Sequence, residues 1–231
     1  MKRHLLFTSS LALATAFAGQ SMADVTAADI WANQQAYLGS IGLRPNGTLS
    51  GNVLSNTEVN AVFPMGVGSF QIKGPDISMV DNGDGTVTIT YPSPSDITLS
   101  GFIQDAGQFE AALRMTHDGY TIVASGDAGD ITYTSDVRNM RIELREVSFP
   151  DSEDFDIAGV MTLDQWNATN HVTEGNLITV ENETEMGSSS AQIIISDPSG
   201  MITTTDQTTA PMRSSMTGAF PGGGSDLWNL S

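Results

Sequence analysis

"RNMRIELREVSF", residues 138–149, is the clearest strand pattern in the chain and decides the fold class. Apolar and polar residues alternate strictly, which is the two-residue period of a strand with one buried face. We expect the inward face to carry Met140, Ile142 and Leu144. We expect the outward face to carry Arg141, Glu143 and Arg145.

Alternation of the same kind recurs on both sides of this stretch. Alternating segments occur at 70–79, 97–103, 109–115, 120–124 and 131–133, and further strands are predicted at 157–163, 177–184 and 191–196. Short turn signals separate them, a rhythm typical of an antiparallel meander rather than of βαβ units. The fold class predicted is therefore mainly β, an antiparallel meander or sandwich-like sheet.

The stretch "VDNGDGTVTITY", residues 80–91, resembles a calcium loop but fits one poorly. With Gly85 at the sixth position of an EF-hand loop, the first position is Val80 and the twelfth is Tyr91, and neither side chain supplies the required ligand. Alternation resumes directly after Gly85. We therefore predict a hairpin turn and no metal site.

One helix is predicted at residues 26–41, packed on the sheet. Thr26 with Asp29 forms a capping-box-like start, and Gly39 and Gly42 supply the end. We interpret the aromatic residues of this helix, Trp31 and Tyr37, as anchors to the sheet.

Residues 1–23 have the pattern of a secretory signal: a basic start, an apolar run and small residues before a cleavage point after Ala23. The apolar run is too short and too polar to predict a membrane anchor. We expect a periplasmic protein that begins at Asp24 and does not span a membrane.

The charge of the chain limits the kinds of molecule that it can bind. The formal net charge is −18, and the signal contains only basic charges, so the exported part is more acidic still. Such a field disfavours nucleic acid. The chain contains no cysteine, so its stability depends on a buried core. Residues 24–200 are predicted as the β-rich domain. Residues 201–231, rich in Ser, Thr and Gly, are predicted as a tail or an incomplete fold.

No catalytic constellation is present in the sequence, and no cofactor or metal is predicted. The chain has three histidines and no G-x-S-x-G, H-E-x-x-H or P-loop pattern. One local feature stands out from the acidic background, the basic residues Arg138, Arg141 and Arg145. Pairing with Glu143 and neighbouring acids is the favoured interpretation. Contact with an anionic ligand is the alternative.

Four stretches resemble a family of exported alphaproteobacterial proteins catalogued as domain of unknown function 2125. These stretches are "ADVTAADIW", "NGDGTVTITYPS", "HDGYTIVASGDAGDITYTSD" and "GVMTLDQWNATNHVTEGN". The resemblance covers most of residues 20–200. It implies an elongated β-rich envelope protein, and members are usually longer than this chain. No functional residue is carried over, because the shared motifs mark turns and strands.

Three functions remain open from the sequence. The first is a non-enzymatic envelope protein that binds an apolar or amphipathic, lipid-like ligand on a concave sheet face. The second is a structural or interaction module that pairs with an envelope protein through a sheet edge. The third is a carboxylate-dependent hydrolase.

Overall fold

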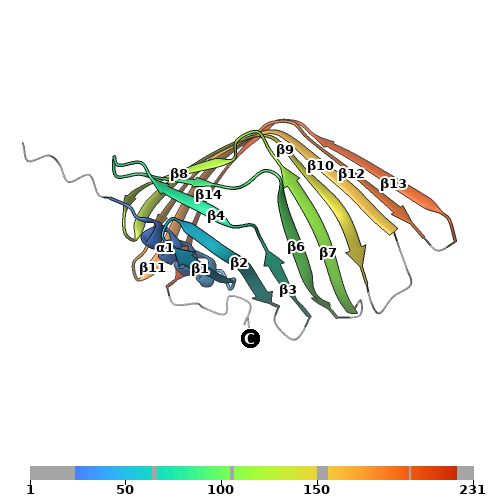
Figure 1. Ribbon diagram of the computed structural model, residues 1–231, viewed down its shortest axis with the longest axis horizontal. Coiled ribbons are helices and arrows are strands. Elements are labelled where there is room, and N and C mark those ends of the chain that lie inside the picture. Colours follow the sequence, from blue (N-terminus) through green and yellow to red (C-terminus); the bar gives the residue numbers. More distant parts are fainter. Residues whose placement is uncertain (1–23, 64–66, 105–106, 150–155, 198, 223–231) are drawn as a thin grey trace, which may run out of the picture.

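The computed structural model describes residues 24–63, 67–104, 107–149, 156–197 and 199–222, which form one helix and a 14-stranded antiparallel sheet (Figure 1). The helix is α1 (Ala27–Ser40). The strands are β1 (Arg44–Ser50), β2 (Val53–Val62), β3 (Gly68–Lys73), β4 (Ile77–Asp81), β5 (Val87–Thr90), β6 (Ser95–Ile103), β7 (Gly107–Thr116), β8 (Thr121–Asp127), β9 (Asp130–Ser148), β10 (Asp156–Thr173), β11 (Leu177–Met186), β12 (Ser189–Ser196), β13 (Ile202–Thr209) and β14 (Met212–Pro221). The predicted mainly β class with an N-terminal helix is confirmed.

Two long strands organise the sheet. The first half of β9 pairs with β8 and its second half with β7. The pairings then run β7-β6-β3-β2-β4-β5-β8, so this part of the sheet returns to β9. β10 pairs with β9 from Asp130 to Leu144 and divides its other side between β12 and β11. β13 and β14 extend these two branches.

The sheet bends along one row, which we call the ridge (Figure 1). Four neighbouring strand paths cross it, and we call them lines: β9, β10, β11 followed by β12, and β13 followed by β14. Within each line the residues that face one side of the sheet are normally two apart. At the ridge this spacing becomes three. The last same-face position before the ridge and the first one after it are 137 and 140 in β9, and 163 and 166 in β10. They are 186 and 189 from β11 to β12, and 209 and 212 from β13 to β14. Each line therefore carries one extra residue, and Asn139 in β9 has a φ of 47°.

Helix α1 begins where the sequence predicts. The Thr26 hydroxyl accepts a hydrogen bond from the Asp29 amide, and the Asp29 side chain accepts one from the Thr26 amide. This reciprocal capping satisfies donors that the first helical turn leaves free. Ile30 on the buried side of the helix is completely inaccessible and belongs to the main hydrophobic core.

The hairpin predicted at residues 80–91 is confirmed. β4 and β5 pair from Ser78 to Thr90, and Gly83 and Gly85 at the tip have positive φ angles of 73° and 84°. The Asp84 carboxylate accepts hydrogen bonds from the amide and hydroxyl of Thr86, so it stabilises the turn. These two bonds, the hydroxyl first, lower the pKa of Asp84.

The prediction of a separate tail at 201–231 is wrong for residues 202–221, which form β13 and β14 of the same sheet. The sequence signal was weak because these strands are mostly exposed on both faces and therefore lack an apolar alternation. Their many threonines nevertheless suit a strand. Residues 223–231 lie outside the described part of the chain, as does the predicted signal at 1–23.

Candidate functional site: the inner face of the sheet

The sheet face that packs against α1, which we call the inner face, has two parts separated by the ridge. The covered wing lies beneath the helix and contains β4, β5, β8, β11, β14, the first half of β9 and the second half of β10. The open wing contains β3, β6, β7, β12, β13 and the remaining halves of β9 and β10. β2 runs into both, because Asn56, with a φ of 53°, interrupts its regular alternation.

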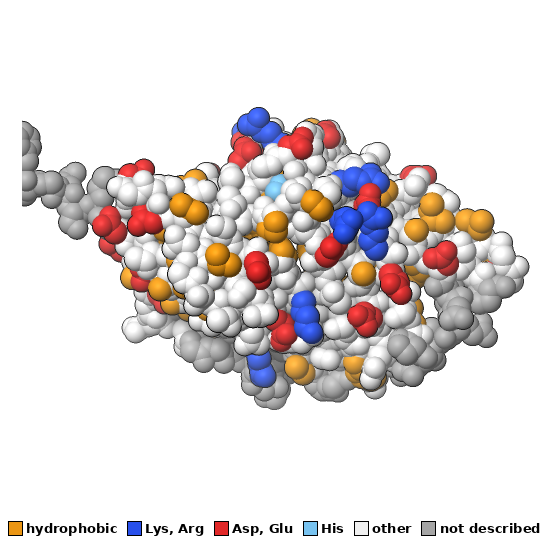
Figure 2. Space-filling model, in the orientation of Figure 1, with side chains coloured by type: hydrophobic (Ala, Val, Ile, Leu, Met, Phe, Trp, Pro, Cys, Tyr) orange, Lys and Arg blue, Asp and Glu red, His pale blue; other side chains and the backbone are white. Residues whose placement is uncertain are grey.

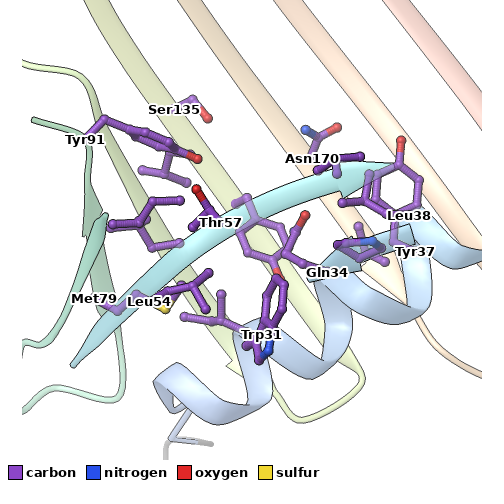
Figure 3. A pocket seen from close by; sticks show the side chains of 18 of the residues that line it. Trp31, Gln34, Tyr37, Leu38, Leu54, Thr57, Met79, Tyr91, Ser135 and Asn170 are labelled. Atoms are coloured by element: carbon purple, nitrogen blue, oxygen red, sulfur yellow. The ribbon is translucent and has the colours of Figure 1, made fainter. Parts of the chain in front are cut away.

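A cavity of about 300 Å³ lies between α1 and the covered wing (Figure 3). The helix contributes Trp31, Gln34, Tyr37 and Leu38. The strands contribute Leu54, Thr57, Met79, Tyr91, Ser135 and Asn170, among others. Most of the lining is apolar or aromatic with a few polar atoms, which is the usual composition of a small-molecule site.

Aromatic rings form one wall of this cavity. Tyr91 and Tyr120 are stacked with their ring centroids 4.6 Å apart, and Trp166 meets Tyr120 edge-on at 6.1 Å. Burial raises the pKa of Tyr91. Burial, and secondarily the neighbouring Tyr91, raises the pKa of Tyr120. Both phenols therefore stay neutral, and the wall presents flat, uncharged surfaces to a ligand.

A buried polar clamp holds α1 over the cavity. The Tyr133 hydroxyl donates to Asn33 Oδ1 at 2.7 Å, and Asn33 Nδ2 donates to Glu174 Oε1 at 2.8 Å. Asn33 is completely buried, so its bond to Tyr133 is shielded from competing water, whereas the bond to Glu174 is part-buried because Glu174 is exposed. The pKa of Tyr133 is raised, chiefly by burial, which keeps its hydroxyl a donor. The clamp therefore fixes the helix to β9 and to the segment after β10.

The apolar inner face continues from the cavity onto the open wing. Val59 lines the cavity and lies opposite Ile72, which lies opposite Leu99, and Leu99 lies opposite Ala111. Directly opposed residues project to the same side of a sheet. A second row on this face comprises Leu113, Leu144, Gly159 and Ile193.

The open wing is less enclosed than the covered wing, although Ala111, Met115 and Leu163 are buried within it. Ile72 is 37% exposed and Ile193 is 46% exposed, whereas the core residues beneath α1 are nearly inaccessible. The inner face therefore combines an enclosed cavity with an adjoining exposed apolar surface.

The predicted arginine cluster lies on the opposite, outer face. Arg141 Nε lies 2.7 Å from one oxygen of Glu143, and Arg145 Nη2 lies 2.6 Å from the other. The Arg141 hydrogen bond is the main cause of the lowered pKa of Glu143. Arg138 lies 3.5 Å from Asp136. The favoured pairing with neighbouring acids is thus present, and the alternative anionic-ligand contact stays a prediction.

Sequence analysis missed a fourth member of this outer cluster. Arg114 on β7 lies directly opposite Glu143 and pairs with Asp96 at 2.8 Å. Figure 2 shows basic side chains gathered next to acidic ones on the face in view. The hydrogen bond between the Arg114 and Asp96 side chains is the main cause of two shifts: Arg114 lowers the pKa of Asp96, and Asp96 raises the pKa of Arg114. Only the pairing of β7 with β9 brings these residues together, so no spacing along the chain could reveal it.

The cavity residues were also missed as a site. Trp31 and Tyr37 pack on the core, as expected for residues that anchor the helix to the sheet. The same two side chains also line the cavity. Helical spacing shows that both belong to an apolar stripe, but it cannot show that space remains between the stripe and the sheet.

Other chemistry has less support in the described residues. His171 and Asp130 form one exposed pair, with 2.6 Å between Nε2 and Oδ1, and this contact lowers the pKa of Asp130. Across the ranges that the structure describes, no group of three or more His, Cys, Asp or Glu side chains is arranged to hold a metal ion. In the same ranges no helix has the length and apolar character needed to cross a membrane.

No protein-family model matches the chain, and neither a curated protein nor a solved structure matches it. The resemblance to domain of unknown function 2125 accordingly stays a prediction.

Proposed function

We propose that this protein is a non-enzymatic periplasmic protein that binds an apolar or amphipathic ligand on the inner face of its sheet. The observation that carries the proposal is the cavity between α1 and the covered wing, which continues through Val59 and Ile72 onto an exposed apolar surface. An apolar chain can enter the cavity while the remainder of the ligand lies along the open wing.

The lining supplies both parts of an amphipathic recognition site. Transfer of apolar ligand surface from water is worth about 25 cal/mol per Å² buried. The polar side chains Gln34, Glu58 and Asn170 also line the cavity and offer hydrogen bonds that can orient a head group.

Ligand recovery from a cavity-filling variant tests the proposal. Ser135 is almost completely buried and lines the cavity, so Ser135→Leu places extra volume where the ligand would lie. Thr134→Leu adds the same side chain at the next, exposed position of β9 and serves as the matched control. Native mass spectrometry of periplasmic extracts should show a bound lipid-like molecule with the unsubstituted protein and Thr134→Leu. The amount of this bound molecule should be reduced or zero with Ser135→Leu. Equal occupancy of all three would contradict the proposal.

Export is proposed with the function and has its own test. N-terminal sequencing of protein from a periplasmic extract should begin at Asp24. A chain that retains Met1 in the cytoplasmic fraction would contradict export without bearing on the cavity.

The second candidate, an interaction module, is favoured by the long sheet edge formed by β13 and β14. The third candidate, a carboxylate-dependent hydrolase, gains no specific support from the cavity, where Glu58 is the one carboxylate among the lining residues that the structure describes.

A further inference from the structure

β13 and β14 together form a long sheet edge. Among the described residues β13 pairs only with β12, and β14 pairs only with β11. Their outward backbone amides and carbonyls are therefore free to pair with another strand. Exposed apolar side chains also concentrate here, namely Met201, Ile202, Met212 and Met216.

Another edge of the sheet differs in ways that limit pairing. β1 has seven residues, contains Pro45, shows an irregular register near Asn46 and packs beside α1. Short length, proline and local irregularity are ordinary protections of an edge. The β13–β14 edge carries just two charged residues, Asp206 and Arg213, and its prolines lie at the ridge (Pro211) and at the last position of β14 (Pro221).

We propose that this edge pairs with the same edge of a second copy of the chain, in antiparallel register around a twofold axis. The axis passes between Thr209 and Ala210, so β13 of each copy lies along β14 of the other. Asp206 then lies opposite Arg213 of the second copy, and symmetry forms this contact twice.

The sidedness of the strands agrees with this register. Thr203 and Gln207 share a face with Ile195 and Ala191, which places them on the inner face. Met216 and Met212 share a face with Asn182 and Met186, which is the inner face of the covered wing. The register places Thr203 opposite Met216 and Gln207 opposite Met212, so inner positions meet inner positions. The extra residue at the ridge is what allows this match.

Charge alternates across the resulting interface. Within one copy Arg213 Nη2 lies 2.8 Å from Glu185, and Gln192 Nε2 donates to Asp206 at 2.8 Å. In the dimer, a row of neighbouring side chains on the outer face crosses the interface. The row consists of Glu185 and Arg213 of one copy, followed by Asp206 and Gln192 of the second copy. Opposite charges directly across neighbouring strands stabilise pairing, and like charges oppose it.

A charge exchange tests the register. The mass of the unsubstituted protein should increase from monomer to dimer with concentration in sedimentation equilibrium, measured at about 0.15 M salt to screen the negative charge of each copy. Asp206→Arg and Arg213→Asp each place like charges opposite one another and should weaken the dimer about tenfold or more. The variant carrying both substitutions restores opposite charges and should recover dimerisation. A monomer at all concentrations, or a double variant as weak as the single ones, would overturn the proposal.

Cysteine pairs test the same register in a chain that has no natural cysteine. Thr205→Cys with Ser214→Cys places thiols opposite each other across the dimer, at a spacing that a disulfide accepts. Thr205→Cys with Ser215→Cys places them on opposite faces and is the matched control. Mild oxidation of the purified proteins should produce disulfide-linked dimers readily with the first pair and poorly with the control. Equal yields would overturn the proposed register.

Discussion

The two wings of the sheet share one inner-face pattern but differ in burial. In the covered wing, Ile131 and Val172 are nearly inaccessible beneath α1, whereas Ile193 in the open wing is 46% exposed. The apolar residue types are similar on both sides of the ridge. Alternation therefore identifies which side chains share a face, but it does not show that the most fully enclosed of them are those beneath the helix.

The largest expected effect contrasts two isoleucines. Ile30→Ala leaves a cavity in the completely buried core and should lower the free energy of unfolding by about 2–5 kcal/mol. Ile193→Ala removes the same atoms from the open wing and should cost less than about 1 kcal/mol, because water already reaches the site. Urea denaturation of both variants measures the difference, and equal losses would show that the open wing is covered in solution.

The next effect concerns the clamp. Asn33→Ala removes the partner of both the Tyr133 hydroxyl and the Glu174 carboxylate and should cost about 1–3 kcal/mol. Because the clamp holds the helix, hydrogen exchange should become faster in α1 and stay unchanged in β6 and β7. A uniform increase over both wings would contradict a local role.

Two glycines of the open wing differ in the space around them, which is tight at Gly101 and loose at Gly159. A Cβ at Gly101 would lie 2.2 Å from the Ser69 carbonyl oxygen and 2.8 Å from the Phe109 ring, so Gly101→Ala should destabilise by about 1–3 kcal/mol. A Cβ at Gly159 would have its nearest neighbours at 3.5 Å, an ordinary contact. Gly159→Ala should therefore be nearly neutral in thermal unfolding. The reverse order would show that the open wing is packed differently.

A smaller effect is expected at Glu143, on the outer face of the open wing. Arg141, as main cause, and the other nearby arginines lower its pKa, so its favourable contribution is present at neutral pH. That contribution should disappear as the pH falls through the lowered pKa and the carboxylate is protonated. Glu143→Gln should therefore unfold at a slightly lower temperature than the parent at about pH 7, and at the same temperature at about pH 2. A difference that grows in acid would contradict this sign.

A similarly small effect on stability should follow reversal of Arg141 and Arg145 to Glu. Both side chains are about half exposed, and exposed pairs contribute roughly 0–1 kcal/mol each. If the arginines only pair with Glu143, binding to anionic vesicles should be absent before and after the reversal. Salt-sensitive binding by the unsubstituted protein that the reversal abolishes would establish the alternative, an anionic-ligand contact.

Local sequence signals predicted the helix, the hairpin at 80–91 and the outward direction of Arg141 and Arg145, because each depends on neighbouring residues. They missed β1, β2, β13 and β14, where apolar alternation is weak or interrupted. They also divided β9 in two, because the inward positions change from Val137 to Met140 with a step of three. The cavity and the partners of Arg114 depend on distant strands, so a single sequence contains no local signal for them.

The aligned extra residues at the ridge also constrain how this gene can change. Deleting one residue near Asn139 would restore the regular two-residue step in β9 and leave the later side chains on their present faces, but it would shift β9 by one residue against its partners on one side of the ridge. The neighbouring lines would keep their own extra residue, so a single deletion could not be absorbed locally. Substitutions can accumulate one at a time along these strands. A change of length at the ridge keeps the same pairing register on both of its sides only when all four lines change together.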